Sequence, residues 1–210
     1  VYFSHLGKWA CGKCGFMHPD LAITNEIIHT PLEGVYNKYN TLAAWLTARQ
    51  LGIADTLIQQ ALSSFIPAFG RMEEIIYQEK KLKILLSKNP TGWNESLRTM
   101  LRSDRPGPLL LVLNDRIPDG TDVSWIWDID MEILQQCTHK IIISGDRCYD
   151  LALRLKYAEI PTDRYEVVEN LETAIQQVLS LSLKQETIWV LPTYSAMLDV
   201  RQIVVGRKIL

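Results

Sequence analysis

The chain has 210 residues, of which 47% are hydrophobic and 22% are charged, a composition typical of one large or two small folded domains. Its formal net charge of −2 argues against a general nucleic-acid binder, which would carry an excess of basic residues. The longest apolar run, at 109–113, is far shorter than the roughly 20 residues that span a bilayer, so we expect no transmembrane segment.

The first 30 residues are rich in turn formers and predict irregular structure. The opening VYFSHLGKWACGKCG lacks the basic segment and apolar core of a signal peptide. Because it also lacks an initiator methionine, we expect the chain to be the C-terminal part of a longer protein.

Cys11 and Cys14 form a C-x-x-C turn, which is typical of one half of a tetrahedral zinc site. A redox pair or two ordinary cysteines are the alternatives, although the flanking sequence lacks the strand and helix of a thioredoxin-like unit. Cys137 and Cys148 fall at expected core positions, and His5 and His18 would give an unusual ligand spacing. We therefore expect the other two zinc ligands upstream of this chain.

Two helices are predicted next, from Asn40 to about Gly52 and from 54 to 65, on the spacing of their apolar residues. From about residue 70, short apolar strands then alternate with helices. This alternation predicts a mostly parallel sheet covered on both faces, a Rossmann-like domain. The predicted strands are 82–87, 108–114, 140–145, 165–169 and 187–193, and the helices are 89–103, a stretch ending near 137, 146–158, 170–183 with Asn170 as N-cap, and 193–204.

Ligands of open α/β sheets bind at the carboxyl ends of the strands, where three polar loops are expected at 87–92, 114–128 and 144–150. The middle loop is the most unusual, because five aspartates and two tryptophans fall within or just after it. Turn formation or helix N-terminal placement explains a single aspartate equally well. We expect Trp127 in the core, and Trp125 either in the core or at a partner contact. The sequence contains neither a Walker A motif nor a G-x-S-x-G elbow, which argues against a self-contained hydrolase.

The segments GVYNKYNTLAAWLTARQLGI, FGRMEE and GDRCYDLALRLKYA resemble the Mur ligase family. More closely, CGKCGF, SKNPTGWNESL, LNDRIPDGTDVSWIWDID and LPTYSAML resemble the MurT-type subunits of lipid II isoglutaminyl synthase, and the likeness extends over essentially the whole chain. It implies that residues 1–70 are the end of a central ATPase domain, with 1–30 as the second half of an inserted zinc ribbon. Residues 71–210 would form the C-terminal Rossmann-like domain.

The resemblance also implies a reaction. MurT-type subunits use ATP to activate the α-carboxylate of D-glutamate in the lipid II stem peptide, and ammonia then gives D-isoglutamine. A GatD-type glutaminase partner supplies the ammonia. An aspartate of the MurT-type subunit joins the cysteine and histidine of the glutaminase to complete its catalytic triad. We expect that aspartate to be Asp122, with Asp128 as second choice. The implied cofactors are ATP, Mg and Zn, and the implied location is the cytoplasm, with lipid II met at the inner membrane face.

The remaining site residues are expected in the nucleotide or substrate cleft. Asn40, and less directly Asn37, would lie near the adenine, although a helix N-cap or a turn role is an alternative for Asn37. Arg71 would meet a phosphate, which suits its planar charged fork. Lys88 and Asp115 would line the cleft.

The family's P-loop, magnesium ligands and first C-x-x-C are missing from this sequence, so we predict that the chain alone neither binds ATP tightly nor catalyses amidation. The alternatives to an amidating ligase are a Mur-type ligase that adds an amino acid, and a non-catalytic scaffold domain.

Overall fold

A computed structural model describes residues 2–3, 9–19, 32, 34–67 and 70–206. Its largest feature is a six-stranded sheet in the order β3-β4-β8-β5-β6-β7. The edge strand β3 runs antiparallel to β4, and all other neighbours are parallel. The strands are β3 (Arg71–Tyr77), β4 (Lys80–Leu85), β5 (Pro106–Val112), β6 (Ile141–Ser144), β7 (Tyr165–Val167) and β8 (Thr187–Pro192).

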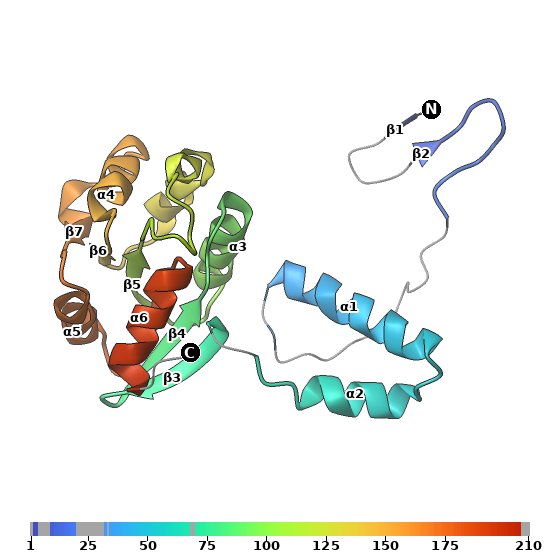
Figure 1. The fold of residues 1–210 in the computed structure, drawn as a ribbon, viewed down its shortest axis with the longest axis horizontal. Helices are drawn as coiled ribbons and strands as arrows, with labels where there is room; N and C mark the ends of the chain where they lie inside the picture. Colours follow the sequence, from blue (N-terminus) through green and yellow to red (C-terminus); the bar gives the residue numbers. More distant parts are fainter. Residues whose placement is uncertain (1, 4–8, 20–31, 33, 68–69, 207–210) are drawn as a thin grey trace.

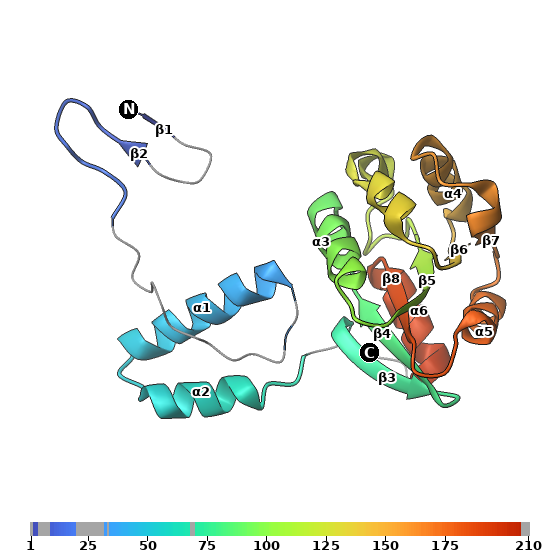
Figure 2. The ribbon, with the colours of Figure 1, turned by 180° about the vertical axis from the view of Figure 1, so that it is seen from behind.

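Helices cover both faces of this sheet (Figures 1 and 2). One face packs against α3, α4 and two 3-10 helices, η1 and η2, and the other packs against α5 and α6. A third 3-10 helix, η3, precedes β7. The helices are α3 (Pro90–Leu101), η1 (Ser124–Asp128), η2 (Met131–Gln136), α4 (Cys148–Tyr157), η3 (Thr162–Arg164), α5 (Leu171–Leu181) and α6 (Tyr194–Val205).

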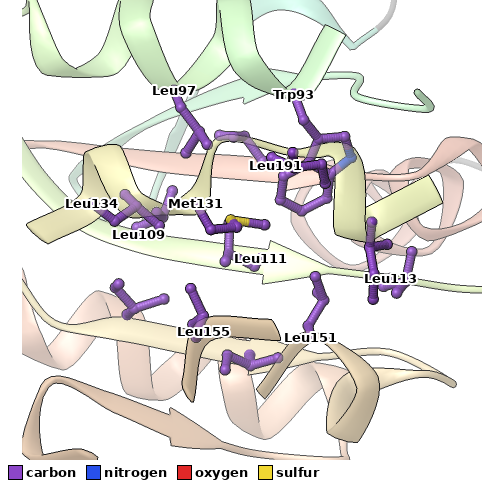
Figure 3. Close-up of a cluster of buried hydrophobic side chains, with 14 of the residues drawn as sticks. Trp93, Leu97, Leu109, Leu111, Leu113, Met131, Leu134, Leu151, Leu155 and Leu191 are labelled. Atoms are coloured by element: carbon purple, nitrogen blue, oxygen red, sulfur yellow. The ribbon is translucent and has the colours of Figure 1, made fainter. Parts of the chain in front are cut away.

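Two cores follow from the two-residue period of the strands. In β5, Leu109 and Leu111 point to the face of α3 and α4, whereas Leu110 and Val112 point to the face of α5 and α6. Figure 3 shows the first core, where Trp93 and Leu97 of α3 and Leu151 and Leu155 of α4 enclose Leu111 from opposite sides. All of these side chains are buried, as expected of central parallel strands.

Asparagine caps fix the start of two helices. Asn89 Oδ1 accepts a hydrogen bond from the Gly92 amide at 2.8 Å, and Asn170 Oδ1 accepts one from the Thr173 amide at 2.9 Å. The predicted cap at Asn170 is therefore confirmed.

The N-terminal part contains a helix pair, α1 (Val35–Gln50) and α2 (Asp55–Ser63), and a short hairpin of β1 (Tyr2–Phe3) and β2 (Trp9–Ala10). A turn through Gly52, whose φ of +79° suits glycine, joins the two helices. The start of α1 contacts the sheet domain, because the Asn37 amide donates to the Met72 sulfur at 3.1 Å.

The α/β architecture with a mostly parallel sheet is confirmed. The expected helix ending near residue 137 is instead the pair of 3-10 helices, and the prediction that Trp127 is buried was wrong, because this ring is 47% exposed. Three residues per turn place Val123, Ile126 and Ile129 on the core side and turn Trp127 outward. Trp125 packs partly against the core.

The division at residue 70 and the zinc ribbon within 1–30 stay predictions, and His5 lies outside the described residues. Within the described part of the chain, no helix has the length and apolarity that crossing a membrane requires.

Candidate functional site

The polar residues at the carboxyl edge of the sheet meet around the buried side chain of Asn114, which follows β5. Its Oδ1 accepts from the Asp146 amide at 3.0 Å, and its Nδ2 donates to Ser195 Oγ at 3.1 Å. Its own backbone amide donates to Thr193 Oγ1 at 3.0 Å. One asparagine therefore joins the loops after β5, β6 and β8, as the rule for parallel sheets anticipates.

Arg116 ties the start of the aspartate-rich loop at 114–128, here called the acidic loop, to the loop after β6 and to α6. Its Nε lies 2.8 Å from Asp146 Oδ2 and its Nη1 lies 2.7 Å from Asp199 Oδ2. The hydrogen bond to Asp146 is the largest cause of the raised pKa of this guanidinium. The charges are partly exposed, so the two ion pairs fix loop geometry more than they add stability.

Asp115, one of the predicted cleft residues, is engaged within the chain. Its Oδ2 lies 3.0 Å from Arg147 Nη1, and the Nε of that guanidinium lies 2.7 Å from Asp150 Oδ2. Hydrogen bonds to Asp150 and then to Asp115 raise the pKa of Arg147 above its ordinary value. Asp115 is thus already paired with a cation in this arrangement.

Asp122 lies just before η1 with an exposed side chain. Its Oδ1 accepts from the Ser124 amide at 2.8 Å, and the backbone and side chain of Ser124 lower the pKa of the Asp122 carboxyl. The residue after it, Val123, is buried and anchors the segment. Asp122 is therefore an ionised, oriented and accessible carboxylate.

Asp128 lies at the far end of η1 and is also exposed. Beside it the Trp127 ring contacts Tyr157 edge-on, with centroids 5.4 Å apart, and the Arg154 guanidinium lies 5.9 Å from its centroid. Trp127 and Tyr157 are exposed, at 47% and 67%. The two predicted aspartates thus flank a 3-10 helix that carries exposed aromatic surface.

A groove of about 390 Å³ opens at the same edge, between the loops after β5 and β6, the starts of α4 and α5, and Asp199 of α6. Its lining includes the Arg116 ion pairs and the hydrogen bond from the Tyr149 hydroxyl to Glu169 at 2.6 Å. Glu169 raises the pKa of that tyrosine. The charged groups of the groove are largely paired with one another.

Of the predicted cleft residues, Asp115 lies in the loop at 114–128, whereas the others lie on or beside α1, β3 and β4. Asn37 is buried and bonded to Met72, whereas Asn40, one helical turn further on, is exposed. Arg71 is exposed at the start of β3, and Lys88 is exposed just beyond β4. The structure thus leaves Asn40, Arg71 and Lys88 accessible, and gives Asn37 a packing contact.

The C-x-x-C turn has features that suit a metal ligand. Cys14 is exposed and Cys11 is half-buried, both as free thiols. The backbone amides of Cys14 and Lys13 lower the pKa of the Cys11 thiol, which favours the thiolate that binds zinc. Within the described residues, no group of three or more candidate ligands converges.

Sequence reasoning missed the residues that organise this edge, namely Asn114, Arg116, Asp119 and Ser195. Asn114 partners lie 32 and 81 residues away, so no local spacing signals them. The one sequence signal for these four residues is that they follow the carboxyl ends of predicted strands, where ligands of such sheets bind.

Three comparisons relate the chain to known proteins. A family described as MurT ligase C-terminal matches residues 86–197. The MurT subunit of the glutamine-hydrolyzing lipid II isoglutaminyl synthase of Streptococcus pneumoniae (strain ATCC BAA-255 / R6) is 31% identical over 99% of this chain and 50% of that protein. The corresponding subunit of Staphylococcus aureus (strain COL) is 32% identical over 76% of this chain and 40% of that protein. The chain therefore spans about half the length or less of these curated relatives.

Solved structures share the fold. A pseudomurein peptide ligase type C from Methanothermus fervidus has a TM-score of 0.61 and 23% identity, over 98% of this chain and 46% of that chain. Mycobacterium tuberculosis folylpolyglutamate synthase, solved with ADP, has a TM-score of 0.64 and 20% identity, over 87% and 43%. Both structures share the fold of the chain.

Proposed function

Because the chain belongs to the MurT ligase C-terminal family, we propose that it is the C-terminal part of an ATP-dependent ligase subunit that works with a glutaminase. The complete enzyme would convert the D-glutamate α-carboxylate of the lipid II stem peptide to an amide, giving D-isoglutamine. ATP would activate the carboxylate as an acyl phosphate, and ammonia from a GatD-type partner would displace the phosphate. The reaction would take place in the cytoplasm at the inner membrane face.

The observation that carries this proposal is the geometry of Asp122. A glutaminase that has a cysteine and a histidine needs a third group to hold the imidazole in the correct tautomer and to stabilise the imidazolium. An exposed carboxylate with a lowered pKa, oriented by Ser124, suits that role. The exposed rings of Trp127 and Tyr157 supply apolar surface of the kind found in protein interfaces.

Glutamine hydrolysis by the complete subunit with its glutaminase tests the role of Asp122. Asp122→Asn keeps the shape and loses the charge, so we expect kcat to fall by roughly 10³–10⁴-fold, as for the aspartate of other triads. Asp128→Asn tests the second choice, at the far end of the 3-10 helix that follows Asp122, and we expect it to stay within about threefold of wild type. Gel filtration checks that each complex forms. Equal activity of all three proteins would overturn the shared triad and favour an amino-acid-adding ligase or a scaffold.

Nucleotide binding is the second part of the proposal. Asn40 is accessible and carries an amide that both donates and accepts, as adenine recognition requires, whereas the Asn37 amide is bonded to Met72. We expect Asn40→Ala in the complete subunit to raise the KM for ATP about five- to tenfold, the cost of roughly one hydrogen bond. An unchanged KM would remove Asn40 from the adenine site. Arg71, Lys88 and Asp115 are proposed in the same cleft, with Mg accompanying ATP.

Zinc is the third part. Cys11 and Cys14 would supply two thiolates, and two further ligands would come from the rest of the complete subunit. Cys11→Ser together with Cys14→Ser should abolish its zinc content, measured by elemental analysis. Full zinc content in that variant would exclude this C-x-x-C as a ligand pair.

A further inference from the structure

The loop that carries Asp122 is held at its centre by a second aspartate, Asp119. Both oxygens of Asp119 are engaged by one residue of α6: Oδ1 accepts from the Ser195 amide at 2.9 Å, and Oδ2 accepts from the Ser195 hydroxyl. The two residues are 76 positions apart in the sequence. Asp119 is half-buried, in contrast to the exposed Asp122.

This contact replaces an ordinary helix cap. Thr193 is the N-cap of α6, but its side chain makes no capping bond, because its Oγ1 accepts from the Asn114 amide instead. The Ser195 amide, in the first turn of α6, would otherwise lack the acceptor that an N-cap supplies. Asp119 fills this place from another loop, and its negative charge is favourable at a helix N-terminus.

The same loop is also closed on itself and clamped on its other side. The amides of Asp119 and Gly120 donate to the Arg116 carbonyl, at 2.8 and 3.1 Å, which makes a tight turn. Arg116 holds that turn against Asp146 and Asp199 through its guanidinium. The segment 116–120 is thus fixed to α6 twice, through Arg116 and through Asp119.

Asp122 lies two residues after this anchored turn, and buried Val123 anchors it from the other side. Only 121 and 122 lie between the two anchors, so the position of the Asp122 carboxylate depends on both. We infer that Asp119 is a positioning residue, which acts through the turn at 116–120 to present Asp122 to the partner glutaminase. This inference rests on the proposed function of Asp122.

Three variants in the complete subunit with its glutaminase test the inference. Asp119→Ala removes both acceptors, and we expect at least a tenfold fall in kcat for glutamine hydrolysis, with the KM for glutamine and the affinity of the two subunits within threefold of wild type. Asp119→Asn keeps an acceptor for the Ser195 amide and a partner for its hydroxyl, so we expect activity within threefold. Asp122→Asn is measured beside them and should abolish hydrolysis.

Asn89→Ala is the matched control, because it removes another helix cap of the same domain. It should lower the melting temperature without lowering kcat. If Asp119→Ala does not fold, Ser195→Ala is the alternative variant, since it keeps the amide donor and removes the two hydrogen bonds of the Ser195 hydroxyl, with Asp119 and with Asn114. We expect it to lower kcat about two- to fivefold.

Hydrogen exchange of 116–124 in the complete subunit gives a readout that does not depend on catalysis. Asp119→Ala should accelerate exchange in this segment at least tenfold, while Asp119→Asn and Asn89→Ala should not.

Unchanged exchange and kcat in Asp119→Ala, with hydrolysis lost in Asp122→Asn, would overturn the inference and leave the proposed function standing. Equal losses in the Asn and Ala variants would also overturn it, because Asp119 would then act through its charge. Full activity of Asp122→Asn would remove the proposed function, even if the exchange result held.

Discussion

The helix pair at 34–67 and the α/β domain that follows it were predicted from the same kind of pattern, yet they bury their side chains very differently. In the α/β domain, central strands such as β5 and β8 are buried along nearly their whole length. In the helix pair, buried hydrophobic side chains are few, such as Trp45 and Ile58, while Leu51, Leu57 and Ile66 are 75%, 57% and 84% exposed. Periodicity thus predicts that a helix forms, whereas a core also requires an element opposite it.

The largest expected change in the free energy of unfolding comes from a substitution in the first core, between the sheet and α3 and α4. Trp93 is fully buried, and its indole nitrogen donates to the Ser87 carbonyl at 2.7 Å. Trp93→Ala should lower the free energy of unfolding by about 3–5 kcal/mol, from lost packing and a cavity. Leu57→Ala, in α2, should change it by less than about 0.5 kcal/mol. Denaturant unfolding of this chain measures both, and similar losses would show that the helix pair has a core of its own.

The next effect concerns backbone turns at the carboxyl edge of the sheet. Gly145 has φ +98°, and a Cβ there would lie 2.5 Å from the Leu113 carbonyl oxygen and 2.8 Å from Asn114 Oδ1. Gly145→Ala should therefore lower the free energy of unfolding by about 2–3 kcal/mol. Gly120→Ala is the matched control, because its φ of +85° is similar but its Cβ would meet open space. It should lose only about 1 kcal/mol. Equal losses in thermal unfolding would mean that φ, and not crowding, sets the cost.

The alkylation rates of Cys11 and Cys148 provide a third comparison, between the N-terminal part and the α/β domain. Amides of Cys14 and Lys13 lower the pKa of Cys11 below the ordinary 9.0, whereas burial raises the pKa of Cys148 above it. The thiolate reacts, so Cys11 alkylation should reach half of its maximal rate below pH 9.0. At pH 8, with a zinc chelator present, Cys11 should react with iodoacetamide at least about tenfold faster than Cys148. Mass spectrometry of the alkylated peptides measures this, and equal rates would contradict the difference in environment.

The smallest expected effect is a gain in the stability of the helix pair. The N-cap of helix α2 is Ala54, which has extended backbone angles but no side chain that can cap the helix, unlike the asparagines before α3 and α5. Ala54→Asp should stabilise α2 by about 0.5–1 kcal/mol. Circular dichroism of the melting chain measures the gain. Ala48→Asp, in the last turn of α1, is the control and should lower stability, because a negative charge is unfavourable at a helix C-terminus.

The sequence predicted the parallel sheet because strands buried on both faces read as uninterrupted apolar runs, as at 108–114. It failed in the second half of the acidic loop, where burial of Val123, Ile126 and Ile129 follows a period of three, the spacing of a 3-10 helix. Such short helices have little sequence signal, and Trp127 was therefore placed on the wrong side.

The candidate site was predictable only in part. Placing the acidic loop at the end of β5 follows from strand order, and Asp122 was chosen through a family resemblance. The attachment of that loop was not predictable, because Asp119 reaches Ser195 across 76 residues and Arg116 reaches Asp199 across 83. Contacts of this length depend on the order of strands in the sheet, which places β8 beside β5.

The first strand and the last helix of the α/β domain are joined by one carboxylate. Glu73 in β3 accepts from the Gly70 amide at 2.9 Å and pairs with Arg201 in α6. This ion pair holds the beginning and the end of the α/β domain close together in space. A domain built this way suits circular permutation: its two ends can be linked and new ends opened at Gln185, the exposed turn before β8, without changing the order of the sheet.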